Sequence, residues 1–286
     1  MTSRITLLLF LMSLVVSLSS CQEKSNNTKV PLKNKKIEKP KSVASKKQSH
    51  KQNLDSLKLD SVLKEAINTV KPKLQLKSFF RKYEALLDDS TSIGVEIKLG
   101  HLFSNKNKHV MICRTNYEYM LFDIYKIVDN KIENVIKFHN SRSPDFANHS
   151  VQDVNGDGYK DFVVHWYPSS GCCRRNIYDV YLSINGTGSF TNQYEFINPT
   201  FSTKEKVIRG VLYGHPGEVG LYKYKWNNLK VDTIEFIYPD QSDTTKRHYI
   251  KTYKRLYSSK NVKKEKLKFL PKEYRNIESF EWFNDY

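Results

Sequence analysis

The chain has 286 residues, and its 47 Lys and Arg against 30 Asp and Glu give a net charge of +17. A strongly basic chain can bind nucleic acid, but a chain with an export signal leaves the compartment where nucleic acid is found, so we do not expect that partner. The charge instead indicates a solvated spacer near an anionic membrane surface. The sequence contains no G-x-S-x-G, H-E-x-x-H, Walker or dinucleotide-binding pattern, so the common enzyme signatures are excluded and we expect no enzyme.

The N-terminal residues have the pattern of a bacterial lipoprotein signal. Arg4 precedes an apolar run over residues 5–16, and Leu18-Ser-Ser-Cys21 ends it like a lipobox. We therefore expect residues 1–21 to be a signal peptide and Cys21 to be lipidated. An ordinary cleaved signal is the alternative. Lipidation would anchor the protein in the cell envelope, facing the periplasm or the cell surface.

Two segments precede the expected folded body. Residues 22–52 are rich in Lys, Asn, Ser and Gln, which predicts a disordered tether. Residues 53–90 are predicted to be helical. Apolar residues recur at mostly helical spacing from Asn53 to Val70, Pro72 closes this helix, and a second short helix is predicted over 76–87.

Residues 91–286 are predicted to form a β-rich domain. Short runs of β-formers alternate with turn signals, and Asp129-Asn130 indicates a hairpin turn. The expected fold is mostly β, an antiparallel sandwich or barrel or a propeller-like sheet. The tail from Lys260 is expected to dock back on this domain. The predicted strands are 95–99, 110–114, 117–128, 131–138, 162–167, 177–183, 193–197, 207–213, 221–226 and 229–237.

One loop carries the strongest functional signal. Residues 153–161 read D-x-N-x-D-G-x-x-D and lead directly into a predicted strand. Hard cations bind several oxygens, and the glycine at position 6 permits the sharp turn that gathers them. We expect one Ca²⁺, bound by the side chains of Asp153, Asn155, Asp157 and Asp161 and the carbonyl of Tyr159. The alternative is an Asx-rich turn without metal.

The loop and three later segments carry a family resemblance. Asp153 to Phe162, Tyr178-Asp-Val-Tyr-Leu, Asn198-Pro-Thr-Phe and Tyr224-Lys-Trp together resemble exported bacterial proteins with a single FG-GAP-like or EF-hand-like calcium loop, similar to periplasmic inhibitors of I-type lysozyme. The resemblance covers roughly residues 150–237 and implies a β-fold binding module. The chain departs from the pattern by an insertion over 169–175.

Cysteines and two loops supply the other candidate residues. Export permits a disulfide among Cys113, Cys172 and Cys173, and Cys113 with one of the adjacent pair is the less strained choice. A zinc site using these cysteines with His165 is an alternative, but it lacks the usual C-x-x-C spacing. The loops 169–175 and 213–220 are the candidate partner-binding surfaces, and pairing of neighbouring strands would bring both to the calcium loop. Their candidate contacts are Arg174, Arg175 and His215.

The expected function is a calcium-stabilised binding module of the cell envelope, attached to a membrane by its N-terminal lipid. Its partner would be a protein or a cell-wall ligand, with a lysozyme as one candidate. Two alternatives stay open: a lysozyme inhibitor of the periplasm or cell surface, and an envelope hydrolase in which calcium is structural.

Overall fold

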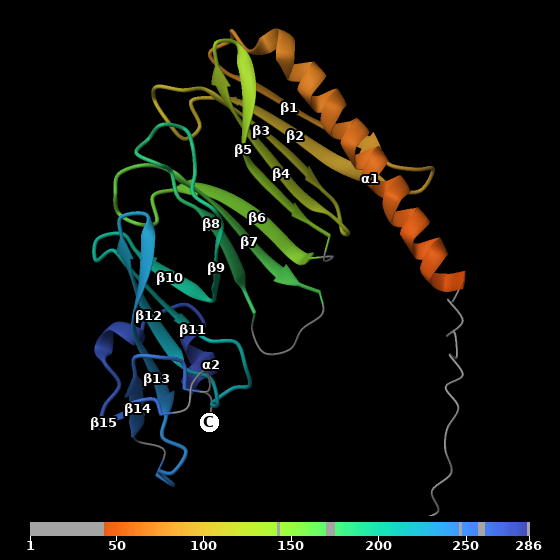
Figure 1. Ribbon diagram of the computed structural model, residues 1–286. Helices are drawn as coiled ribbons and strands as arrows, with labels where there is room; N and C mark the ends of the chain where they lie inside the picture. Colours follow the sequence, from red (N-terminus) through yellow and green to blue (C-terminus); the bar gives the residue numbers. More distant parts are fainter. Residues whose placement is uncertain (1–42, 142–143, 170–174, 246–247, 257–260, 285–286) are drawn as a thin grey trace, which may run out of the picture. The chain divides into compact units, whose positions relative to one another are not determined.

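The computed structural model describes residues 43–141, 144–169, 175–245, 248–256 and 261–284 (Figure 1). Lys47–Tyr286 is one compact unit and Met1–Lys46 is another. The described strands form three antiparallel sheets, in which neighbouring strands follow one another along the chain. The predicted class, a mostly β antiparallel protein after a helical segment, is confirmed. Among the described residues, none of the three sheets closes on itself.

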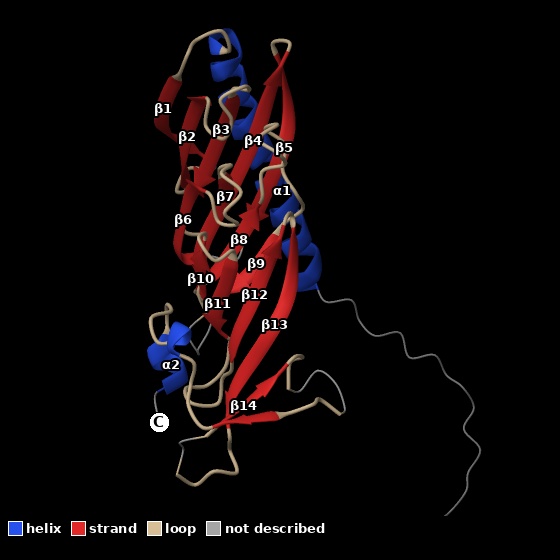
Figure 2. Cartoon of the chain, turned by 90° about the vertical axis from the view of Figure 1, so that its left-hand side faces the viewer, coloured by secondary structure: helices blue, strands red, loops and turns tan. Residues whose placement is uncertain are grey.

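Each sheet is a simple meander (Figure 2). The first contains β1 (Phe79–Leu86), β2 (Ser92–Gly100), β3 (His109–Thr115), β4 (Met120–Val128) and β5 (Lys131–Asn140). The second contains β6 (Pro144–Gln152), β7 (Asp161–Pro168), β8 (Ile177–Tyr181) and β9 (Tyr194–Ile197). The third contains β10 (Pro199–Ser202), β11 (Val207–Val211), β12 (Leu221–Asn227), β13 (Lys230–Pro239), β14 (Tyr249–Thr252) and β15 (Glu265–Leu267).

The first sheet is covered on both faces. Successive side chains of a strand point to opposite faces of the sheet, so the strands contribute residues to two hydrophobic clusters, one on each face. On one face, Ile97 of β2 packs with Val62 of helix α1 (Val43–Val70). On the other face, Phe122 of β4 meets Phe162 of β7, with ring centroids 5.7 Å apart. The first sheet therefore lies between α1 and the second sheet.

The stacking continues through the third sheet to the C-terminal segment. Val163 of β7 packs in the same cluster as Phe236 of β13, which joins the second sheet to the third. The opposite face of the third sheet, including Leu221, is covered by Tyr274 of the 3-10 helix η2 (Lys272–Tyr274) and Phe283 of helix α2 (Phe280–Asn284). The predicted docking of the tail is thus confirmed within the residues described.

The N-terminal helix is longer than predicted. It begins at Val43 rather than Asn53, so the last part of the predicted tether is helical. Residues 43–52 contain no Pro or Gly, and a helix whose later turns are packed can extend into a polar segment. A 3-10 turn, η1 (Lys71–Lys73), follows at Pro72, where the helix was expected to close. The predicted signal peptide and residues 22–42 of the tether lie outside the described residues.

The predicted helix over 76–87 is wrong. This segment contains β1, which pairs with β2 in continuous register from Phe79 opposite Leu99 to Leu86 opposite Ser92. Tyr83 and Ala85 of β1 pack in the same cluster as α1. Tertiary pairing with a strongly apolar neighbour here outweighs the weak helical spacing of the aromatic residues.

The predicted hairpin at Asp129-Asn130 is confirmed. The two residues have φ of 48° and 61°, as a tight turn between right-twisted strands requires. The structure adds β6, which no pattern indicated because seven of its nine residues are either polar or small. It forms the outer edge of the second sheet, where a strand needs little apolar surface. The short strands β10, β14 and β15 were also missed.

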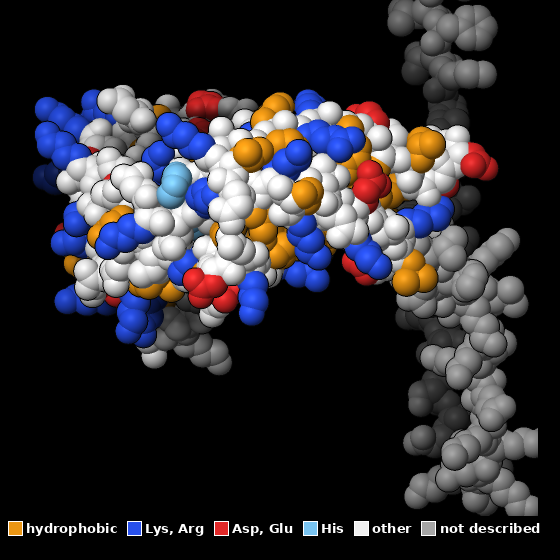
Figure 3. Space-filling model, turned by 90° about the horizontal axis from the view of Figure 1, so that it is seen from above, with side chains coloured by type: hydrophobic (Ala, Val, Ile, Leu, Met, Phe, Trp, Pro, Cys, Tyr) orange, Lys and Arg blue, Asp and Glu red, His pale blue; other side chains and the backbone are white. Residues whose placement is uncertain are grey.

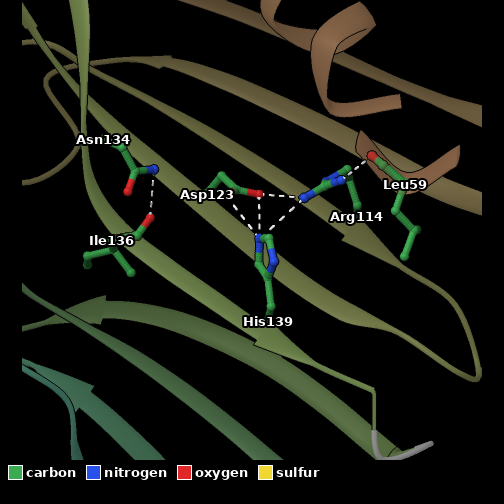
Figure 4. Close-up of polar contacts among 6 residues, drawn as sticks. All are labelled: Leu59, Arg114, Asp123, Asn134, Ile136 and His139. Carbon is green, nitrogen blue, oxygen red and sulfur yellow. Dashed lines mark hydrogen bonds and ion pairs between the residues drawn. The ribbon is translucent and has the colours of Figure 1, made fainter. Parts of the chain in front are cut away.

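A buried ion pair ties α1 to the first sheet (Figure 4). Arg114 Nη2 donates to Asp123 Oδ2 at 2.6 Å, and Nη1 donates to the carbonyl of Leu59 in α1 at 2.5 Å. His139 Nε2 lies 3.0 Å from Asp123 Oδ1. Burial opposes ionisation of Asp123, but His139 and Arg114 lower the pKa of its carboxyl below the ordinary value. The pair is therefore charged at neutral pH.

The positive charge is not gathered into one surface on the face seen in Figure 3. Lys and Arg side chains are spread over that face among acidic and apolar ones. Within the described part of the chain, no helix is long and apolar enough to cross a membrane.

Candidate metal loop and binding pocket

The predicted calcium loop is the hairpin connection between β6 and β7. Gln152 and Asp161 pair at its base, so residues 153–160 form the turn. Gly156 and Gly158 have φ of +74° and +86°, a region that glycine enters with little strain. The two glycines therefore set the path that turns the side-chain oxygens of the loop inward.

Those oxygens accept hydrogen bonds from the backbone of the loop. Asp153 Oδ1 accepts from the amide of Gly156 at 2.7 Å, and Oδ2 from Gly158 at 2.9 Å. Asn155 Oδ1 accepts from the amide of Asp157 at 3.1 Å. Asp157 Oδ1 accepts from Tyr159 at 2.9 Å. The contacts of Asn155 and Asp157 are Asx turns, and the two longer contacts of Asp153 hold the loop closed.

Asp161 is the buried member of the set. Its carboxylate accepts from the amide of Val154 through Oδ2 at 2.9 Å and from the amide of Ser183 through Oδ1 at 2.8 Å. The pKa of Asp161 is raised to about 7, mainly by burial and also by the charges of Asp157 and Asp153, although the two amides act in the opposite direction. A cation in the loop would remove this penalty on the ionised carboxylate.

The loop is also packed against two neighbouring turns. A Cβ at Gly156 would lie 2.3 Å from the carbonyl oxygen of Thr203, in the turn between β10 and β11. The ring of Tyr159 covers Gly186 in the turn after β8, since a Cβ there would lie 2.6 Å from that ring. The loop thus connects the second sheet to the third.

The side chains of the loop offer the kind of ligand atom that calcium prefers, but their carboxylates are too far apart to bind one ion as they stand. All the predicted ligands offer oxygen, and carboxylate oxygens keep acceptor capacity beyond one hydrogen bond. However, the carboxylates of Asp153, Asp157 and Asp161 do not form a group within 4.8 Å of one another. Asn155 Nδ2 also donates to Asp157 Oδ2 at 3.0 Å. Binding would require that hydrogen bond to open and the carboxylates to draw together.

Arg175 and the candidate loop 213–220 do not lie near the calcium loop, and residues 170–174 lie outside the described residues. Asp161 begins β7 at the calcium loop and Pro168 ends it, and eight strand residues span roughly 25 Å. Arg175 lies beyond that far end, where its Cζ is 5.2 Å from the centre of the Tyr213 ring. The expected proximity is wrong because a loop at the start of an antiparallel strand cannot meet the loop at its end. Arg175 instead contacts Tyr213, the first residue of the other candidate loop.

A pocket of about 550 Å³ lies beside this contact. His215, predicted as a partner contact, lines it, whereas Arg174 lies outside the described residues. Helix α2 fixes one wall, since Trp282 Nε1 donates to the carbonyl of Gly214 at 2.9 Å. The pocket is mostly apolar with charged groups of both signs, and its other lining residues include Ile197, Leu212, Tyr213, Glu218, Val219, Tyr238 and Arg255.

No sequence pattern indicated the residues that complete this pocket. Arg255 follows β14 and Tyr238 lies in β13, far along the chain from the loop that they adjoin. Strand patterns predict which faces are apolar, but the order in which strands pair brings such residues together. A predicted order of three meanders would have placed the β11–β12 loop and the end of β13 at the same end of the third sheet.

Among the cysteines with a predicted role, Cys113 is the one that the structure describes. Cys113 lies in β3, is 5% exposed, and forms no disulfide within the described residues. Burial raises the pKa of its thiol to about 12. Cys21, Cys172 and Cys173 lie outside the described residues, so lipidation and the disulfide stay predictions.

Comparison of the chain with protein-family models, curated proteins and solved structures finds no match. The class of the protein is therefore defined by its own structure: three stacked antiparallel meanders with a hairpin loop rich in carboxylates at one end and a pocket at the other.

Proposed function

We propose that the protein is a calcium-stabilised binding module of the bacterial cell envelope, anchored to a membrane through Cys21. The pocket beside Arg175 and Tyr213 is the observation that carries the binding role. Its volume of about 550 Å³ falls in the usual range for ligand pockets, which are apolar with a few placed polar groups.

The pocket favours a ligand with an anionic group attached to an apolar or ring-shaped body. Arg175 lies over the ring of Tyr213, and its buried Nε has no hydrogen-bond acceptor among the described residues. Arg255 places a guanidinium in the lining itself, against one carboxylate from Glu218. Guanidinium groups match carboxylates in geometry, and an arginine fixed on an aromatic ring loses little entropy on binding.

Replacing Arg175 by glutamine or Tyr213 by alanine is expected to weaken ligand binding at least about 10-fold, because anchoring arginines and aromatics dominate binding energy. The measurement is sedimentation of the protein with isolated cell walls, which carry peptide carboxylates, and direct titration with an I-type lysozyme.

Arg81→Gln provides the matched control. Arg81 also lies over a tyrosine, with its Cζ 4.9 Å from the ring centre of Tyr83, but on the edge strand β1. The Arg81→Gln substitution should leave ligand binding unchanged. Equal binding by all three variants and the wild type, or no binding of either probe by the wild type, would contradict the proposed ligand site.

Calcium acts in this proposal as a structural ion. The packing of the loop on Thr203 and of Tyr159 on Gly186 means that ordering the loop orders two neighbouring turns. Asp153, Asn155, Asp157 and Asp161 would bind the ion through side-chain oxygen, with Tyr159 contributing its carbonyl. The pocket at the other end of the strands would be affected only through the stability of the sheets.

Without calcium, Asp161 predicts a pH dependence of stability. Its pKa is raised to about 7 in the folded state, so the folded protein holds a proton that the unfolded chain releases near pH 4. The free energy of unfolding should therefore fall as the pH rises from about 4 to about 7. Calcium should abolish this decline and add about 2.7 kcal/mol at a hundredfold excess over Kd.

The test is thermal unfolding of wild type, Asp157→Asn and Asp145→Asn, each with millimolar calcium and with chelator across that pH range. Asp145 is an exposed carboxylate on β6 and serves as the control. Asp157→Asn should lose the calcium response and Asp145→Asn should keep it. Identical melting of the wild type in both conditions, with no heat of calcium binding, would leave the loop as an Asx turn only.

A further inference from the structure

A second group of metal-binding side chains lies between the first and second sheets. Glu96 of β2 and Cys113 of β3 are directly opposite in the antiparallel register, so they share one face of the first sheet. His149 of β6 comes from the second sheet. One ligand atom from each, a carboxylate oxygen, the thiol sulfur and a ring nitrogen, lies within 4.8 Å of the other two.

The surroundings orient these side chains toward one another. Cys113 belongs to the cluster that joins the two sheets and is 5% exposed. The ring of His149 packs against both Phe122 and Phe162, with centroids 5.2 and 6.1 Å away. Glu96 and His149 are half-buried, so an ion has a path to the group from solvent.

We propose that Glu96, Cys113 and His149 form a zinc site that links the first sheet to the second. Thiolate, imidazole and carboxylate are the ligands that zinc takes in proteins, and tetrahedral coordination leaves one position for water. The thiolate makes this set unsuitable for calcium, which takes oxygen ligands. The site is separate from the loop at Asp153–Asp161 and does not depend on the proposed function.

The charges balance when the metal is bound. Zinc carries two positive charges, and the Cys113 thiolate and the Glu96 carboxylate carry one negative charge each, while His149 binds as the neutral ring. The thiol proton passes to solvent as the zinc–sulfur bond forms. Lys98, whose Nζ lies 2.6 Å from Glu96 Oε1, is a neighbouring cation that opposes zinc, and the carboxylate has two oxygens to share between them.

Cobalt(II) reports on this site directly, because a cobalt–thiolate bond gives a near-ultraviolet charge-transfer band that oxygen and nitrogen ligands do not. Metal-free protein with reduced thiols would be titrated with cobalt and then zinc. We expect one zinc per chain, displacement of cobalt by zinc, and a higher melting temperature with zinc. Cys113→Ala should abolish the band, and Glu96→Gln and His149→Ala should each raise the zinc Kd at least about 100-fold.

Three control variants separate this site from others. The Cys172→Ser/Cys173→Ser double variant and His165→Ala, which alters a half-buried histidine stacked on Tyr178, should retain the band and the zinc affinity. Asp157→Asn should retain them too, which distinguishes zinc from calcium binding. Absence of the thiolate band in the wild type overturns the proposal even if a variant fails to fold. So does a band that survives Cys113→Ala and disappears in the double variant.

Discussion

Replacing Arg114 by methionine should lower the free energy of unfolding by about 3–5 kcal/mol, because it leaves the carboxylate of Asp123 buried without its cationic partner. The two side chains are 1% and 2% exposed, so water cannot replace the lost contact. The substitution also removes the donor to the Leu59 carbonyl and so loosens α1 from the first sheet. Chemical denaturation of wild type and variant measures the difference.

The exposed pair between Lys251 and Glu265 is the matched control. Its atoms are 3.0 Å apart, but Glu265 is 50% exposed, and Glu265→Gln should cost less than about 1 kcal/mol. Arg114→Met combined with Asp123→Leu should recover part of the loss, since no charge is then buried alone. A cost below that of the surface pair, or a double variant no better than the single one, would contradict the assigned role.

The same carboxylate predicts acid sensitivity. The pKa of Asp123 is lowered in the folded state, so its contribution to stability is complete above the unfolded value of about 3.9 and is lost as the pH falls through the folded pKa. This loss of stability occurs at a lower pH than the change due to Asp161, which falls between about pH 4 and pH 7. Measuring the free energy of unfolding across both ranges therefore distinguishes the two groups.

Gly156→Ala is the second substitution expected to have a large effect, about 3 kcal/mol or more. It forces a side chain into a left-handed conformation, which costs roughly 1–2 kcal/mol, and places the new Cβ 2.3 Å from the carbonyl oxygen of Thr203. Because backbone must move to relieve the contact, the second sheet should pack less closely on the turn between β10 and β11.

Gly158→Ala is the control that distinguishes the steric contact with Thr203 from the strain of a positive φ. Gly158 has φ of +86°, but a Cβ there meets nothing within 4 Å. It should therefore cost only the conformational part, roughly 1–2 kcal/mol. Comparable destabilisation by the two substitutions would show that the Thr203 contact contributes nothing to stability.

The sequence predicted most strands because each buried face repeats every two residues, as Ile93, Val95, Ile97 and Leu99 do in β2. Apart from three short strands, it failed at β1 and β6, where the strand lies at the edge of its sheet and needs fewer apolar residues. Periodicity reports burial, so an exposed edge strand leaves only a faint signal.

The candidate site could be predicted where its ligands are consecutive in the chain. Residues 153–161 carry their own turn signals, and the local hydrogen bonds follow from them. Glu96, Cys113 and His149 are brought together only by the register of two strands and the stacking of two sheets. No spacing rule describes such a set, because its separations depend on the whole fold.

The order of the strands has a consequence for how the chain folds and opens. Each strand pairs with its neighbour in sequence, so the contacts within a sheet are local and the contact order is low for a β protein. Each meander can form its backbone hydrogen bonds before the next one emerges during synthesis. Side-chain packing then joins the sheets, and because hydrophobic clusters cover both faces of each sheet, the central strands are the last to exchange their amide hydrogens with solvent.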